Sequence, residues 1–175
     1  MRRKENVPEP LIEMKVTGLT IDPFTNMPII ILKDLDEKSA LPIWIGLIEA
    51  SAIATELEKI KLARPMTHDL MKNILNTLGV SVSRIEVNDL ADNTFYARIY
   101  LVSSGQNHVI DSRPSDAIAL ALRMGAPIFV DRKVVEKSRQ IDLNKDFPAA
   151  QKGEKEKWAE FLENLNPEDF GKYKM

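Results

Sequence analysis

The sequence of 175 residues contains no cysteine. This absence excludes a disulfide framework, a cysteine-based zinc site, an iron–sulfur cluster and a cysteine nucleophile. Histidine is scarce as well: His68 and His108 are the two in the chain, too few to build a metal site from imidazoles alone. The chemistry left to this chain is that of carboxylates, arginines and one or two imidazoles.

The chain also lacks an excess of positive charge and a long apolar run. It carries 24 basic and 26 acidic residues, with a pI of about 5.8. Because proteins that coat phosphate backbones are usually strongly basic, this balance disfavours a generic nucleic-acid coat. No stretch of about 18 apolar residues is present, which argues against a membrane span, and no apolar h-region follows the charged N-terminus. We therefore expect a soluble, cytoplasmic protein without membrane contact.

Hydrophobic periodicity divides the chain into three parts. Residues 1–10 are polar, contain two prolines and are expected to form a flexible arm. Residues 11–139 carry dense periodic signal and are expected to form one domain. Residues 140–175 predict a polar linker and then an amphipathic helix, whose apolar stripe is Trp158, Phe161, Leu162 and Leu165.

The order of elements within 11–139 indicates the fold class. Strands are predicted at 11–21, 27–32 and 41–45, and Pro42 puts the third at a sheet edge or at the strand start. Two helices follow, the second closed by Gly79, then three more strands, a helix, a strand and a short helix. Hairpin-linked strands followed by helices predict an α+β fold. Its mixed, largely antiparallel sheets come from two three-stranded meanders packed with helices.

Two segments resemble each other: Arg64–Leu70 and Asp111–Ile118. Each has Arg-Pro, then Ser or Thr, then Asp, then a helix that ends in glycine. Thr67 and Ser115 are good N-cap candidates, and an aspartate in the first turn favours the helix dipole. Two well-signalled helix starts are therefore a complete structural interpretation of both segments.

A functional interpretation accounts for residues that capping does not need. A helix start attracts anions, an arginine fork matches phosphate, and a histidine moves protons near neutral pH. Carboxylates that lie together can hold a hard divalent cation. The candidates are His68, Asp69, Asp111 and Asp116 for catalysis, Arg64 and Arg113 for substrate binding, and Asp111, Asp116 and Glu49 for a metal.

An ordered set of motifs resembles the bifunctional nuclease family. The motifs are Leu41–Gly46, Glu49-Ala50, Arg64–Leu70, Asp92–Ala97 and Asp111–Leu120, and they extend over about residues 11–139. The resemblance implies a single α+β domain that cuts both DNA and RNA. It also implies nucleic acid as a partner and a homo-oligomer, most simply a dimer.

These observations lead to a first hypothesis and two alternatives. The first is a nuclease for DNA and RNA assisted by Mg²⁺ or Mn²⁺ on the acidic residues. The alternative from another class is a non-enzymatic module that binds an anionic small molecule or a partner protein. In a third interpretation, the Arg–Asp pairs only lock loops in place.

Overall fold

The structure is a computed structural model that describes residues 11–142, with side chains described as far as residue 139. The arm expected at residues 1–10 and the linker and amphipathic helix expected beyond residue 142 lie outside the described residues. The last described helix, α4, runs Arg132–Asp142. It is longer than the short helix predicted at the end of the domain and extends past residue 139, the expected domain boundary.

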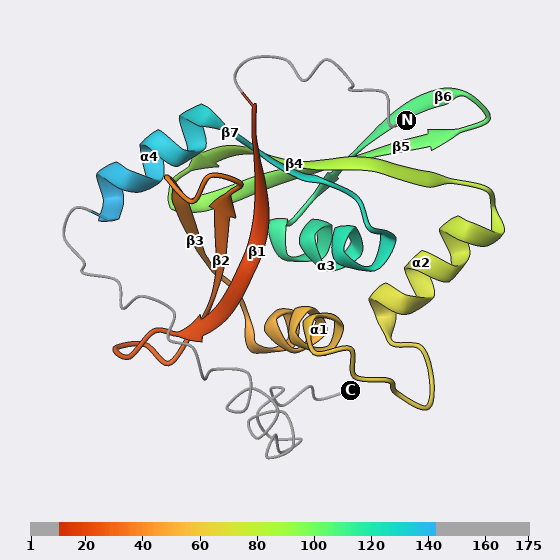
Figure 1. Ribbon diagram of the computed structural model, residues 1–175, viewed down its shortest axis with the longest axis horizontal. Coiled ribbons are helices and arrows are strands. Elements are labelled where there is room, and N and C mark those ends of the chain that lie inside the picture. Colours follow the sequence, from red (N-terminus) through yellow and green to blue (C-terminus); the bar gives the residue numbers. More distant parts are fainter. Residues whose placement is uncertain (1–10, 143–175) are drawn as a thin grey trace.

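All seven strands of the described part form one mixed sheet in the order β3-β2-β1-β7-β4-β5-β6 (Figure 1). The first meander is antiparallel, as is the second. The strands are β1 (Leu11–Ile21), β2 (Pro28–Asp34), β3 (Ala40–Trp44), β4 (Ser81–Ala91), β5 (Thr94–Ser103), β6 (Gln106–Ser112) and β7 (Ile128–Asp131). The α+β fold with two three-stranded meanders is confirmed.

Strand β7 joins the two meanders into one sheet. It pairs antiparallel with β1 and parallel with β4, so it lies in the middle of the sheet although it comes late in the chain. Its side chains Ile128, Phe129 and Val130 are all buried, as a central strand requires. Strand β3, which contains Pro42, lies at one edge of the sheet, as predicted.

Helices α1 (Leu47–Leu57), α2 (Thr67–Thr77) and α3 (Pro114–Met124) lie together on one side of the sheet (Figure 1). Helix α3 is the central one: it contacts α1, α2, β4 and β5. Its Ala117, Ala119 and Ala121 are fully buried, and these small side chains permit close packing on every side. Helix α4 packs separately, against β3, β4 and β7. None of the helices within 11–142 is long and apolar enough to cross a membrane.

The N-caps differ from those predicted. The cap residues are Met66 for α2 and Arg113 for α3, so Thr67 and Ser115 lie inside the first turns. At α3 the reason is Pro114, because proline lacks an N–H and is favoured as the first helical residue. The hydroxyl of Ser115 is therefore not used as a cap.

Helix α2 carries an apolar stripe, but none of its side chains is fully buried. Leu70, Ile74 and Leu78 are each at least half exposed. An amphipathic helix normally turns its apolar side to the core. Here the stripe forms an outer apolar face of the described domain, which we call the α2 face and define by Leu70, Ile74 and Leu78.

Asp22 connects the turn between β1 and β2 to the edge strand β3. Its carboxylate accepts hydrogen bonds from the backbone N–H of Phe24 at 2.9 Å and from the indole N–H of Trp44 at 3.0 Å. These two bonds, the Phe24 bond foremost, lower the pKa of Asp22 from 3.8 to about 2. The ring of Trp44 is thereby held in one orientation.

We predict that Asp22→Asn removes a pH-dependent part of the stability. Because the folded pKa of Asp22 lies below its unfolded value, its contribution is complete above about pH 4 and is lost as the pH falls towards 2. Urea unfolding of both proteins between pH 2 and 6 measures this. The difference in unfolding free energy between the two proteins should shrink as the pH falls from 6 to 2. A difference that does not change with pH would contradict the assignment.

Candidate functional site

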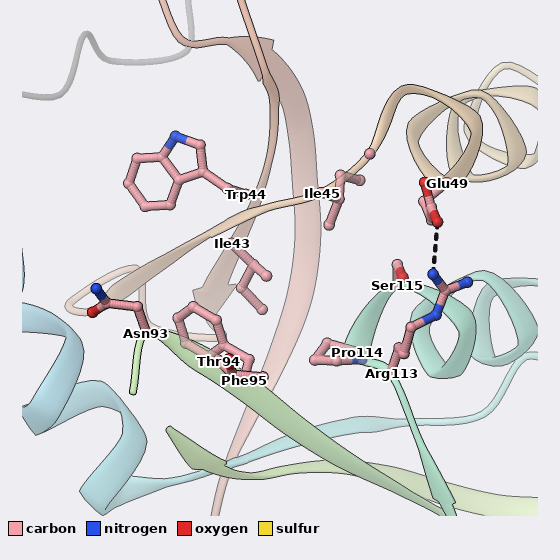
Figure 2. Close-up of a pocket in the computed structure, with 11 residues that line it drawn as sticks. Ile43, Trp44, Ile45, Glu49, Asn93, Thr94, Phe95, Arg113, Pro114 and Ser115 are labelled. Atoms are coloured by element: carbon pink, nitrogen blue, oxygen red, sulfur yellow. Dashed lines mark hydrogen bonds and ion pairs between the residues drawn. The ribbon is translucent and has the colours of Figure 1, made fainter. Parts of the chain in front are cut away.

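A pocket of about 280 Å³ opens where the start of α1, the start of α3, the end of β3 and the turn between β4 and β5 meet (Figure 2). In Figure 2 the Trp44 and Phe95 rings lie on one side, and the Glu49–Arg113 pair lies on the other. The lining residues are Ile43, Trp44, Ile45, Gly46, Glu49, Asn93, Thr94, Phe95, Arg113, Pro114 and Ser115.

Arg113 connects two helices at this pocket. Its Nη1 donates to Oε1 of Glu49 in α1 at 2.8 Å, and its Nε donates to Oδ2 of Asp116 in α3 at 2.7 Å. These contacts, the one to Asp116 foremost, raise the pKa of Arg113. The side chain is 64% exposed, and its Nη2 has no hydrogen-bond partner among residues 11–139. One fixed N–H edge is thus available to an anion.

His68 extends this network to α2. Its Nε2 lies 3.0 Å from Oδ1 of Asp116, and its side chain is only 12% exposed. Burial opposes the ionised form of Asp116, but the hydrogen bonds from Arg113 and His68 outweigh it and lower the pKa of Asp116. Asp116 is therefore a carboxylate that positions Arg113 and is itself oriented by His68.

Glu49 is placed by a glycine. A Cβ added to Gly46 would overlap the carboxylate of Glu49, which folds back over the start of α1. A side chain at position 46 would push the carboxylate away from Arg113. Glycine is therefore needed here for space, not for an unusual backbone angle.

Asp69 belongs to a second ion pair. Its Oδ1 accepts from Nε of Arg123 at 2.7 Å, and its Oδ2 accepts from the backbone N–H of Met66. Arg123 is 2% exposed and also donates to the backbone carbonyls of Ala119 and Ala52. The Arg123 hydrogen bond is the main cause that lowers the pKa of Asp69. This pair joins all three helices and does not line the pocket.

Asp111 lies on the other face of the sheet. It is paired with Arg98 across β5 and β6, and residues paired in this way point to the same face. The neighbours Ala97 and Ile99 are buried against the helices, so Arg98 and Asp111 point away from them. The structure therefore does not bring Asp111 to Glu49 and Asp116.

The predicted magnesium or manganese ligands are consequently not assembled. No group of three or more acidic or histidine side chains in the described part of the chain is arranged to hold a metal ion. Glu49 and Asp116 do come together, but both bind the guanidinium of Arg113. As arranged, these residues do not fit a hard divalent cation, which needs several free oxygen ligands.

Arg64 is not brought to the pocket by any described contact. It lies exposed in the loop between α1 and α2 and forms no ion pair with another described residue. The neighbouring Lys59 is bound to Glu56 at 2.6 Å. Arg64 therefore lies in a solvated loop, and it differs from Arg113 although their motifs are alike.

Of the pocket residues, Glu49 and Arg113 were predicted as site residues, whereas Ser115, Trp44 and Phe95 are among those that were not. Ser115 is 7% exposed, and its hydroxyl has no hydrogen-bond partner in the described part of the chain. Its proline neighbour was the available signal, because Pro114 at the first helical position moves the cap back to Arg113. Nothing in the local sequence indicates that Trp44 and Phe95 share a pocket.

Fold and site together define an α+β domain with an arginine-centred pocket at two helix starts. The model of the bifunctional nuclease domain matches residues 30–142, and the chain belongs to this family. An uncharacterised protein of Mycobacterium tuberculosis is 35% identical over 162 residues, which is 90% of this chain and 97% of that protein.

Named plant proteins are more distant relatives. Bifunctional nuclease 1 of Oryza sativa subsp. indica is 28% identical over 97 residues, 54% of this chain and 29% of the plant protein. Bifunctional nuclease 2 of Arabidopsis thaliana is 28% identical over 118 residues, 63% of this chain and 36% of the plant protein. The matches cover about a third of each of these plant proteins.

We predict that the two arginines of α3 differ in their effect on stability. Arg123→Met removes a buried ion pair and two bonds to carbonyls, and should lower the unfolding free energy by about 3 kcal/mol. Arg113→Met removes exposed ion pairs and should cost about 0.5 kcal/mol. Denaturant unfolding measures both, and equal losses would contradict the division into a structural and a functional arginine.

Proposed function

We propose that this protein hydrolyses phosphodiester bonds in DNA and RNA, with the phosphate bound at Arg113. Family membership supports the reaction class. The observation that carries the site is the free Nη2 edge of Arg113, held in place by Glu49 and Asp116 at the start of α3. The free Nη2 group of a guanidinium, a serine hydroxyl and the unpaired N–H groups of a helix start all suit a phosphate.

Within this proposal each residue has a distinct task. Arg113 binds the phosphate and neutralises the charge that grows on its oxygens. Glu49, at the pocket, accepts a proton from water as the water oxygen bonds to phosphorus and the bond to the leaving oxygen breaks. The leaving oxygen takes its proton from solvent. Asp116 and His68 are positioning residues, because they act through Arg113.

The proposed reaction does not use a divalent cation. Mg²⁺ or Mn²⁺ at Glu49 and Asp116 would have to displace Arg113 from both carboxylates. The arginine-bridged arrangement therefore predicts cleavage that persists in EDTA. Loss of all cleavage in EDTA, with recovery on adding Mg²⁺ or Mn²⁺, would contradict the scheme.

We predict that Arg113→Met and Asp116→Asn each lower cleavage of single-stranded DNA and RNA by about 100-fold, because a preorganised donor at the phosphate is lost or displaced. Initial rates with the purified full chain measure this. The matched controls are Arg98→Met and Asp111→Asn, on the opposite face of the sheet. Parental rates for Asp116→Asn, or equal losses for Asp111→Asn, would show that the site is elsewhere.

A non-enzymatic binding role is the second candidate function. The observation that favours it is that the acids near the pocket are neutralised by Arg113, as they would be in an anion-binding module. In that case the chain binds an anionic small molecule at the same residues and cuts nothing. The cleavage assay distinguishes the two functions.

We also propose the dimer that the family resemblance implies, placed at the α2 face. This face is apolar and exposed, whereas His68 and Leu75 of the same helix turn towards the domain. Contiguous exposed apolar surface of this kind is typical of interfaces. Asp69 is the one acidic residue of α2, and it is paired with Arg123. A second copy on this face would therefore not bring unpaired acidic residues of the two α2 helices together.

We predict that Leu70→Glu together with Ile74→Glu converts the dimer to a monomer, since a dimer would have to bury the new charges. Light scattering on the full chain gives the mass. Val109→Glu, at an exposed position on β6, is the control and should stay dimeric. A dimer that survives the double change would place the contact on another surface.

A further inference from the structure

The pocket beside Arg113 has an apolar side that phosphate binding does not use. Ile43 and Ile45 are buried beneath it, and the rings of Trp44 and Phe95 stand at its side, partly exposed (Figure 2). A phosphate needs no such surface. Two aromatic rings across a pocket from an anion-binding group are a pattern suited to a nucleotide, because every base has a face that stacks.

The ring of Trp44 is fixed before any ligand arrives. Its indole N–H is bound to Asp22 at 3.0 Å. Because the ring is already oriented, stacking of a ligand on it carries no entropy cost for ordering this side chain. Phe95 lies at the start of β5, whose register with β4 places it opposite Leu90, so its position is set by the sheet.

The polar side of the pocket has a hydroxyl group without a hydrogen-bond partner. Ser115 lines the pocket, and its hydroxyl takes part in none of the hydrogen bonds among the described residues. This hydroxyl is not one of the fully buried polar atoms that lack a partner; among the described residues that atom is Oδ1 of Asn88, so the Ser115 hydroxyl reaches the pocket surface. It can therefore donate to a ligand beside the Nη2 edge of Arg113.

The size of the pocket restricts the ligand. Its volume of about 280 Å³ lies just below the ~300–1,000 Å³ typical of ligand sites. A paired base inside a duplex cannot reach such a concave site, because it would first have to leave the stack. The pocket therefore suits one unpaired nucleotide.

We propose that this pocket binds a single nucleotide as a nucleoside monophosphate unit. The base lies against Phe95 and Trp44, and the phosphate binds Arg113 and Ser115. The location of the phosphate rests on the function proposed above, whereas the base site rests on the aromatic side of the pocket. It follows that unpaired strands and free mononucleotides are bound in preference to duplex.

Titration calorimetry of the full chain in EDTA tests this with AMP and with ribose 5-phosphate, which lacks the base. AMP should bind at least about tenfold more tightly than ribose 5-phosphate. Phe95→Leu, which keeps the apolar volume, should weaken AMP by about tenfold and leave ribose 5-phosphate unchanged. Ser115→Ala should weaken both ligands. Tyr96→Leu, the next residue on the opposite face of β5, is the matched control and should leave both affinities unchanged.

Equal affinity for AMP and ribose 5-phosphate, or an unchanged AMP affinity in Phe95→Leu, would overturn the base site. Circular dichroism and unfolding of each variant show that it is folded. The outcomes also separate this proposal from the proposed function. Tight AMP binding without strand cleavage would support the base site and contradict the proposed nuclease function. Cleavage without any preference for AMP over ribose 5-phosphate would support the nuclease function and contradict the base site.

Discussion

The burial of helix α3 between the sheet and two other helices is the constraint on which the site depends. Its alanines let neighbouring backbones approach closely, and an arginine lies at each end. Arg123, near the C-terminal end, is buried and binds Asp69 together with two carbonyls. Arg113, at the N-terminal end, is exposed and binds Glu49 and Asp116. One element thus holds α1 and α2 in place and presents a guanidinium at the pocket.

The two Arg-Pro motifs have different tasks for the same reason. Asp116 follows a helix start that is packed into the domain, so its carboxylate can join residues from α2 and α3 at the pocket. Asp69 follows a helix start on the outside, where it caps α2 and meets the buried Arg123. Arg64 precedes that outer helix and stays in solvent. Local capping rules apply to both motifs alike, and only the environment separates them.

Much of the fold was predictable, since alternation in β1 and β5 and the glycines after α2 and α3 are local signals. Strand β7 was predicted as a strand, but its place between β1 and β4 was not, because pairing partners far apart in the chain leave no local trace. The same limit applies to the site. Glu49, His68, Arg113 and Asp116 were candidates that the structure brings together, whereas Asp111 was a candidate that the pairing of β6 with β5 turns to the other face.

Composition and motif order were enough to predict the class of chemistry and the family. With no cysteine and two histidines, carboxylates and arginines remained, and the order of the motifs indicated the bifunctional nuclease domain. Which acid meets which arginine depends on the folded arrangement of the helices and strands. A carboxylate beside a guanidinium is an ion pair rather than a free metal ligand, and whether the two meet depends on helix packing and strand register. Both arise from contacts between residues distant in the chain, such as Glu49 and Arg113.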